Sequence, residues 1–304
     1  MRFAISIPQA VEPSFRPADL AGFLRRAEEL GFDSAWTQEQ VLGSAPRLGA
    51  IETMTFAAAC TERLRLGCSV FVTPLHNPLQ LAKSLSTLDR LSSGRLEIGV
   101  GTGGPGRPFA AFGITGEALV ARFLEHLNLM KALWTEPKVT LDGRFWQLQD
   151  AAMEPKPVQR PYPPIWFGAH VPAALRRAVR NGDGFFGAGS STTERFAEQV
   201  TLVRQMVAEQ DRDPAGFPIA KRVYIAVDDN ATRGRERMRA ALSELYGNPD
   251  DLSAVAVCGP PDACVRGISS VHAAGAELVL FTPLFDDAEQ MERLAAEVIP
   301  ALTD

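Results

Sequence analysis

Three polar side chains follow strand-like runs of this sequence and are its first candidates for chemistry. Glu39 comes shortly after the run "SAWT", His76 follows "GCSVFV", and His170 directly follows "WFGA". A carboxylate and an imidazole can each bind or transfer a proton near neutral pH. In a barrel of parallel strands, reacting groups gather at the carboxyl ends of the strands. We therefore expect His76 and His170 to contact a ligand, and Glu39 is the acid best placed for catalysis.

Two expected helix starts carry small or hydroxyl residues that suit an anion. The stretch "FGAHVPAALRRA" places Gly168, Ala169 and His170 ahead of one helix, and "GAGSSTTERF" places Ser190 and Ser191 ahead of another. Free N–H groups and the helix dipole attract anions at a helix N-terminus. Ser191, with Glu194 three residues later, equally fits an ordinary cap. Two such starts after consecutive strands favour a phosphate site.

A glycine-rich stretch, "GTGGPG" at 101–106, matches the dinucleotide-binding pattern GxGxxG after a strand. A phosphate-binding turn must run straight into a helix. Here Pro105 and Pro108 flank Arg107, and the next expected helix begins only near Gly116. We interpret the glycines as a loop whose backbone can approach a flat ligand closely, or as a mobile loop.

Several enzyme classes and metal sites lack their characteristic residues. No GxSxG elbow is present, which excludes a hydrolase of that type. The lysines fall on expected helices, in an insertion or, as Lys221 does, at a strand start, which disfavours a Schiff-base aldolase. The histidines and cysteines show neither metal-site spacing nor a CxxC pair, so no metal is expected, and His126 and His272 are expected to be ordinary helix residues. A glycosidase using Glu39 with Asp228 or Asp229 is the alternative outside redox chemistry.

Composition and charge limit the partners of the chain. Its 304 residues are 46% hydrophobic, with 31 basic and 36 acidic residues and a net charge of −5. No basic block could follow a phosphate backbone, so we expect no nucleic acid partner. The N-terminal run "RFAISI" is too short for a signal sequence or a membrane span, so no membrane contact is expected. The four cysteines lie in apolar surroundings without a CxxC pair, which favours the reduced cytoplasm.

Strand-like and helical patterns alternate along the chain. Eight strands are expected, at 2–7, 34–37, 65–72, 95–101, 164–169, 184–189, 221–228 and 276–282. The helices between them show apolar residues at three- and four-residue spacing, and Asn77 before Pro78 marks one helix start. Eight such units over this length predict an α/β fold, the (β/α)8 TIM barrel, with a doubly wound sheet as the alternative.

One segment interrupts this alternation between the fourth helix and the fifth strand. Asp142-Gly143 lies between two strand-like runs and predicts a small hairpin, which a proline-rich stretch follows. We therefore expect one domain over 1–304 with an insertion at about 138–160.

The ordered series of these motifs resembles the luciferase-like monooxygenase superfamily of flavin- and deazaflavin-dependent barrels. The resemblance covers nearly the whole chain and rests on "AEELGFDSAW", "TERLRLGCSVFVTPLHNPLQLAKSLSTLDRLSSGRLEIGVGTG", "PPIWFGA", "NGDGFFGAG" and "AGAELVLF". Within it, "HNP", "LDRLSSGRLEIGVGTG" and "RAVRNGDGFF" are most similar to the branch that uses coenzyme F420. FMN enzymes are near neighbours.

The resemblance implies positions for the cofactor. It places a non-proline cis peptide bond between Ser69 and Val70, whose bulge would support the cofactor ring. Further ring contacts are implied at Glu39, Cys68 and the segment Gly101, Thr102 and Gly103. Phosphate contacts are implied at Gly168, Ala169 and His170 and at Gly189, Ser190 and Ser191. A homodimer is also implied.

The family's sugar-phosphate dehydrogenases differ from this chain at two catalytic positions. They carry a histidine where this chain has Gln40 and a glutamate where it has Gly104, so activity on a sugar phosphate is not expected. We expect an F420-dependent oxidoreductase that transfers a hydride between the cofactor and a small organic substrate. Glu39 would move the proton, Gln40 or His76 would orient the substrate, and the variable loops, including Pro105–Phe112, would form its pocket. The alternatives are an FMN-dependent monooxygenase and a barrel that binds a ligand without redox activity.

Overall fold

Eight strands alternate with helices along the chain at the positions that the apolar runs predict. The computed structural model describes residues 1–104, 108–247 and 253–303, so 105–107 of the glycine-rich stretch and of the expected substrate loop lie outside the described residues. The eight strands are β1 Arg2–Ser6, β2 Ser34–Thr37, β3 Arg65–Val72, β4 Leu96–Gly101, β7 Ile165–Gly168, β8 Gly184–Gly187, β9 Ile219–Val227 and β11 Leu278–Thr282. This order of strands and helices is that of a (β/α)8 barrel.

The helices follow the predicted periodicity, and one predicted cap is wrong. Their bounds are α1 Pro17–Glu29, α2 Ala50–Cys60, α3 Pro78–Leu91, α4 Leu119–Thr135, α5 Pro172–Asn181, α6 Thr193–Ala208, α7 Ala231–Tyr246, α8 Pro261–Ala273, α9 Asp287–Arg293 and α10 Pro300–Thr303. The Asn77 side chain caps α3, as predicted. Ser191 does not cap α6, because the helix begins two residues after it and the Thr192 hydroxyl accepts the hydrogen bond from Arg195 N–H.

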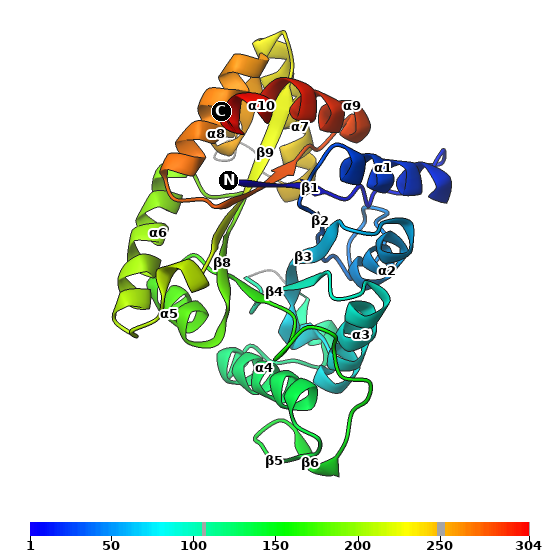
Figure 1. The fold of residues 1–304 in the computed structure, drawn as a ribbon, viewed down its shortest axis with the longest axis vertical. Coiled ribbons are helices and arrows are strands. Elements are labelled where there is room, and N and C mark those ends of the chain that lie inside the picture. Colours follow the sequence, from blue (N-terminus) through cyan, green and yellow to red (C-terminus); the bar gives the residue numbers. More distant parts are fainter. Residues whose placement is uncertain (105–107, 248–252, 304) are drawn as a thin grey trace. The chain divides into compact units, whose positions relative to one another are not determined.

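The chain divides into two compact units, and the first comprises Met1–Pro8, Arg16–Trp36 and Trp166–Asp304. Its strands pair in parallel in the order β2, β1, β11, β9, β8 and β7. A further parallel strand beside β9, β10 (Val257–Gly259), was not predicted, because three residues give no periodic signal. Trp36 packs against Phe186 and Trp166 in the core of this unit. Helices α5 and α6 lie side by side in this unit (Figure 1).

The second unit comprises Gln9–Phe15 and Thr37–Ile165. In it β3 and β4 pair in parallel, and β5 (Val139–Asp142) and β6 (Gln147–Ala151) form the predicted hairpin beyond α4 (Figure 1). The Glu125 carboxylate on α4 accepts hydrogen bonds from three successive N–H groups of the hairpin loop, which fixes the hairpin to the helix. The single domain over 1–304 with its insertion stays a prediction.

Across the described ranges, no helix combines the length and the apolar character that crossing a bilayer requires.

Candidate active site

Glu39 and His76 form a hydrogen-bonded pair in the second unit. The Glu39 side chain is 6% exposed, and its Oε1 lies 2.6 Å from His76 Nε2. Its Oε2 accepts a hydrogen bond of 2.6 Å from Val72 N–H. The His76 ring packs edge-on against Phe71 and keeps 22% of its side chain exposed. Both carboxylate oxygens are therefore fixed, and the imidazole connects the buried carboxylate to the surface.

Strand β3, whose last residue Val72 is hydrogen-bonded to Glu39, contains a β-bulge. Two residues of β3, Ser69 and Val70, stand opposite one residue of β4, Gly99. The peptide bond between Ser69 and Val70 is cis, as predicted. A Cβ atom on residue 99 would lie 2.0 Å from the Cys68 carbonyl oxygen. Only a glycine at this position lets the backbones of β3 and β4 approach so closely.

The expected ring contacts of β3 and β4 lie on these two paired strands. Cys68 is fully buried. The Ser69 Oγ atom is also buried, and it has no hydrogen-bond partner among the described residues. Gly101 ends β4, and Thr102 and Gly103 follow it, with a φ of +75° at Gly103 that suits glycine. A buried hydroxyl normally has a partner. A polar ligand atom at the bulge would supply one to Ser69.

The Gln40 side chain lies against Gly43 in its own loop. A Cβ atom added at Gly43 would meet Gln40 Nε2 at 1.7 Å. The substrate-orienting role of Gln40 stays a prediction.

Five apolar residues line a small pocket together with Glu39. They are Val41, Leu42, Val72, Leu75 and Pro108, and of these Pro108 lies in the loop Pro105–Phe112 that was expected to form the substrate pocket. Val41 and Leu42 are 52% and 55% exposed, which is high for large apolar residues. We call these five residues the apolar wall. A signal for it was the pair Val41-Leu42 immediately after a predicted catalytic segment.

The expected phosphate contacts of the first unit lie ahead of α5 and α6. Gly168 ends β7, Ala169 is buried, and His170 is exposed with its carbonyl accepting a hydrogen bond of 3.3 Å from Gln199 Nε2 on α6. Helix α5 begins at Pro172, so these residues stand slightly farther from its first turn than predicted. The contact of His170 with a ligand stays a prediction.

A turn at Ala188–Ser191 connects β8 to α6 and contains the other expected phosphate contacts. Ser191 N–H donates to the Ala188 carbonyl and closes the turn. A Cβ atom on Gly189 would lie 2.9 Å from Arg222 Nε, so this glycine lets a cation approach the turn. Lys221, inside β9 and 2% exposed, donates hydrogen bonds to the carbonyls of Ala188 and Ser191. The sequence analysis placed Lys221 at a strand start and assigned it no function.

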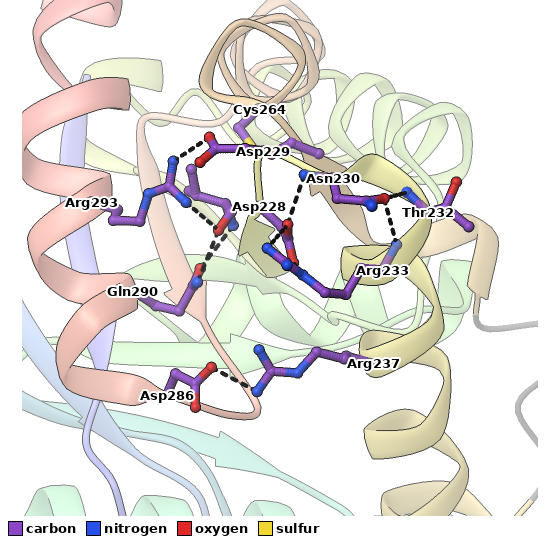
Figure 2. Close-up of polar contacts among 12 residues, drawn as sticks. Asp228, Asp229, Asn230, Thr232, Arg233, Arg237, Cys264, Asp286, Gln290 and Arg293 are labelled. Carbon is purple, nitrogen blue, oxygen red and sulfur yellow. Dashed lines mark hydrogen bonds and ion pairs between the residues drawn. The ribbon is translucent and has the colours of Figure 1, made fainter.

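Asp228 and Asp229 belong to an ion-pair network and not to a pair of catalytic acids. Figure 2 shows Asp228 held by Arg233 and Asp229 held by Arg293. Arg233 donates to both Asp228 oxygens, at 2.9 and 2.7 Å. These hydrogen bonds hold the pKa of Asp228 below its usual value. Both acids are therefore held in ion pairs with arginines, which argues against the glycosidase alternative.

Replacing Asp228 by asparagine is expected to lower the melting temperature by a few degrees at pH 7. The folded pKa of Asp228 is depressed, so its ion pair stabilises the protein above the ordinary carboxyl pKa near 4 and stops doing so as the pH falls. The difference between Asp228→Asn and the parent should shrink towards pH 3 in thermal melts. Asp229→Asn is the control, because that side chain is 78% exposed and its ion pair should contribute little.

Three other titratable side chains have pKa values that burial shifts. His126, on a helix as predicted, is fully buried in α4 and stacks on Trp146, and burial, with the nearby charges of Arg122 and His76, lowers its pKa to about 4. Burial raises the pKa of the Cys258 and Cys264 thiols to about 11 and about 12. In the described part of the chain, no three His, Cys, Asp or Glu side chains gather as metal ligands would.

Comparison with curated proteins finds relatives along nearly the whole chain. The chain is 31% identical to an F420-dependent glucose-6-phosphate dehydrogenase of Beutenbergia cavernae, in a match covering 97% of this chain and 96% of the relative. It is 28% identical to the protein of the same name from Kineococcus radiotolerans, again over 97% of this chain and 96% of the relative.

Comparison with solved structures identifies the fold. Monooxygenase RslO1 from Streptomyces bottropensis matches with a TM-score of 0.84 and 25% identity, over 99% of this chain and 100% of that chain. An F420-dependent secondary alcohol dehydrogenase, in complex with an F420-acetone adduct, matches with a TM-score of 0.83 and 21% identity over 100% of both chains. These similarities and the order of the elements confirm the predicted (β/α)8 barrel.

A match to a protein-family model shows the family of the chain. The family model described as luciferase-like monooxygenase matches residues 1–254, most of the chain, and the first relative exceeds 30% identity over nearly its whole length. The chain therefore belongs to the luciferase-like monooxygenase family.

Proposed function

We propose that this chain is an oxidoreductase that uses coenzyme F420 to transfer a hydride to or from a small organic substrate. The observation that carries this proposal is the β3 bulge, where the Ser69 hydroxyl is buried without a hydrogen-bond partner among the described residues. Three residues later, Val72 ends the strand and donates a hydrogen bond to the Glu39 carboxylate. The similarity to relatives named as F420-dependent dehydrogenases supports the choice of cofactor.

The residues present suit such a cofactor at two places. In the second unit, the bulge and the close approach at Gly99 offer a backbone surface for a flat ring, and Ser69 Oγ offers it a polar partner. In the first unit, the Ala188–Ser191 turn precedes the N-terminus of α6, which favours an anion such as the cofactor phosphate. When bound, F420 supplies a ring that accepts or donates a hydride.

The Glu39–His76 pair would handle the proton that accompanies the hydride. In the oxidation of an alcohol, the C–H bond gives its hydride to the cofactor and the O–H bond gives its proton to a base. Glu39 accepts this proton, and the partly exposed His76 ring passes it to solvent. In the reverse direction the same pair delivers a proton to a carbonyl oxygen.

The apolar wall suggests a substrate with apolar substituents. Val41, Leu42 and Leu75 line the same small pocket as Glu39, and no side chain of the apolar wall could pair with a phosphate. A sugar phosphate would need cationic or polar partners in place of this wall. The chain also lacks the two catalytic residues of the sugar-phosphate dehydrogenases that it resembles, having Gln40 and Gly104 instead. We therefore infer an apolar secondary alcohol or ketone as the substrate class.

Shortening one residue of the apolar wall should weaken substrate binding without affecting the cofactor. Leu42→Ser removes hydrocarbon next to Glu39, and we expect KM for a medium-chain secondary alcohol to rise about tenfold, from the loss of about 1.4 kcal/mol of apolar contact. The affinity for F420 should change less than twofold. Steady-state kinetics over a series of 2-alkanols gives both values. Leu91→Ser, at an exposed leucine at the end of α3, is the matched control and should leave KM unchanged.

Direct titration tests the cofactor assignment. The purified protein is titrated with F420 and with FMN while fluorescence and absorbance are followed, and we expect saturable binding of F420. FMN binding with oxygen consumption would instead support a monooxygenase, which the similarity to monooxygenase RslO1 favours as the second candidate. Binding of F420 without turnover of any alcohol or ketone would indicate a ligand-binding barrel. The cytoplasmic location and the homodimer stay predictions.

A further inference from the structure

We propose that Lys221 is a positioning residue that holds the Ala188–Ser191 turn in the conformation that binds the cofactor phosphate. This inference rests on the proposed function. Lys221 lies inside β9, and its ammonium group is buried beneath the turn. Near the Gly187 backbone its side chain passes the Phe196 ring of α6, with Nζ 5.6 Å from the ring centroid.

The hydrogen bonds of Lys221 set the direction of two peptide groups. Its Nζ donates to the Ser191 carbonyl at 2.7 Å and also to the Ala188 carbonyl. In a trans peptide unit the C=O and the following N–H point in opposite directions. The N–H groups of Gly189 and Thr192 must therefore point away from Lys221. The ammonium thus gathers carbonyl oxygens on the inner side of the turn and leaves amide hydrogens on its outer side, where an anion would bind.

The charges around the turn support the same role. Burial, with the neighbouring positive charge of Arg222, lowers the pKa of Lys221 to about 7. The ammonium group donates to two carbonyl oxygens, and among the described residues no carboxylate forms an ion pair with it. Arg222, the next residue of β9, approaches the turn at Gly189. An anion bound at the turn would therefore favour the charged form of Lys221.

The sequence position of Lys221 fits a role beyond packing. The strand "IAKRVYIAV" is otherwise apolar at its buried positions, and a buried lysine costs more than an apolar side chain of the same size. Methionine would fill the same space without a charge. A lysine at this position fits our proposal. The lysine supports the turn, and the turn binds an anion.

Two ligands that share the ring and the ribityl chain test this role. F420 also carries the phosphate and the acidic tail attached to it, and the fragment FO lacks both. For Lys221→Met we expect the affinity for F420 to fall at least tenfold and the affinity for FO to change less than twofold, in fluorescence titrations of the full chain. Lys221→Arg, which keeps the charge and the donors, should recover most of the F420 affinity and serves as the test if the methionine variant does not fold.

The control is a partly buried lysine that also donates to two backbone carbonyls. Lys156 in the second unit has a 12% exposed side chain, donates to the carbonyls of Leu133 and Glu136 at the end of α4, and lies 3.9 Å from the Glu154 carboxylate. Lys156→Met should lower the melting temperature but leave the F420 to FO affinity ratio unchanged.

The outcomes separate this inference from the proposed function. An equal loss of F420 and FO affinity in Lys221→Met, or no loss of either, overturns the role of Lys221 while the cofactor assignment stands. If the unaltered protein binds neither F420 nor FO, the proposed function fails and the inference fails with it.

Discussion

Replacing Glu39 by glutamine is expected to lower kcat about 100-fold or more, with little change in folding. The glutamine oxygen can still accept from Val72 N–H and its amide can still donate towards His76, so the local geometry survives. What is lost is a group that can accept a proton, and general acid–base groups typically contribute 10²- to 10⁴-fold to a rate. The measurement is the single-turnover reduction of F420 by the best alcohol of the series, followed by absorbance.

The control for Glu39→Gln is the same substitution at Glu52, an exposed residue of α2 in the same unit. Glu52→Gln should retain the parent rate. The affinity of Glu39→Gln for F420 should stay within about threefold of the parent, which separates a loss of proton transfer from a loss of binding. A Glu39→Gln protein with more than a third of the parent rate would rule out Glu39 as the proton acceptor.

His76→Gln should lower the rate less than Glu39→Gln, because water can reach a partly exposed position and replace the ring. The comparison of the two variants therefore tests the order of the proton path. An equal effect would mean that the pair acts as one unit, in which each side chain depends on the other.

Strands and their order could be predicted because buried parallel strands leave continuous apolar runs. The run 65–72 coincides with β3, and Asn77 caps α3 as its position before Pro78 indicates. The cap of α6 was assigned one residue too early, because Ser191 and Thr192 are both good caps and sequence alone does not choose between neighbouring hydroxyls.

The candidate site was less accessible from the sequence, since it depends on contacts between residues far apart in the chain. The Glu39–His76 hydrogen bond joins residues 37 positions apart, although each was identified separately by its place after a strand. The contacts of Lys221 were missed because they are made with a turn that lies 30 residues earlier in the chain. A lysine within an apolar strand pattern was the available signal, and a buried charge in such a pattern calls for a partner.

Replacing Gly99 by alanine is expected to remove F420 binding and lower the melting temperature by about 5 °C or more. The added Cβ would lie 2.0 Å from the Cys68 carbonyl oxygen, a backbone atom that cannot rotate away as a side chain can. The pairing of β3 and β4 must therefore shift at the bulge, and an overpacked core typically costs about 1–3 kcal/mol. Fluorescence titration with F420 and a thermal melt measure the two effects.

Gly22→Ala is the matched control for this substitution. Gly22 lies inside α1, where an added Cβ meets no atom within 4 Å, so alanine should stabilise the helix by about 0.5–1 kcal/mol and leave F420 binding unchanged. Retention of F420 affinity by Gly99→Ala, alongside a lowered melting temperature, would show that the bulge supports the strand pairing and not the ring. A loss of F420 affinity in a Gly99→Ala protein that still melts cooperatively, with Gly22→Ala unaffected, would connect the close approach of β3 and β4 to the cofactor.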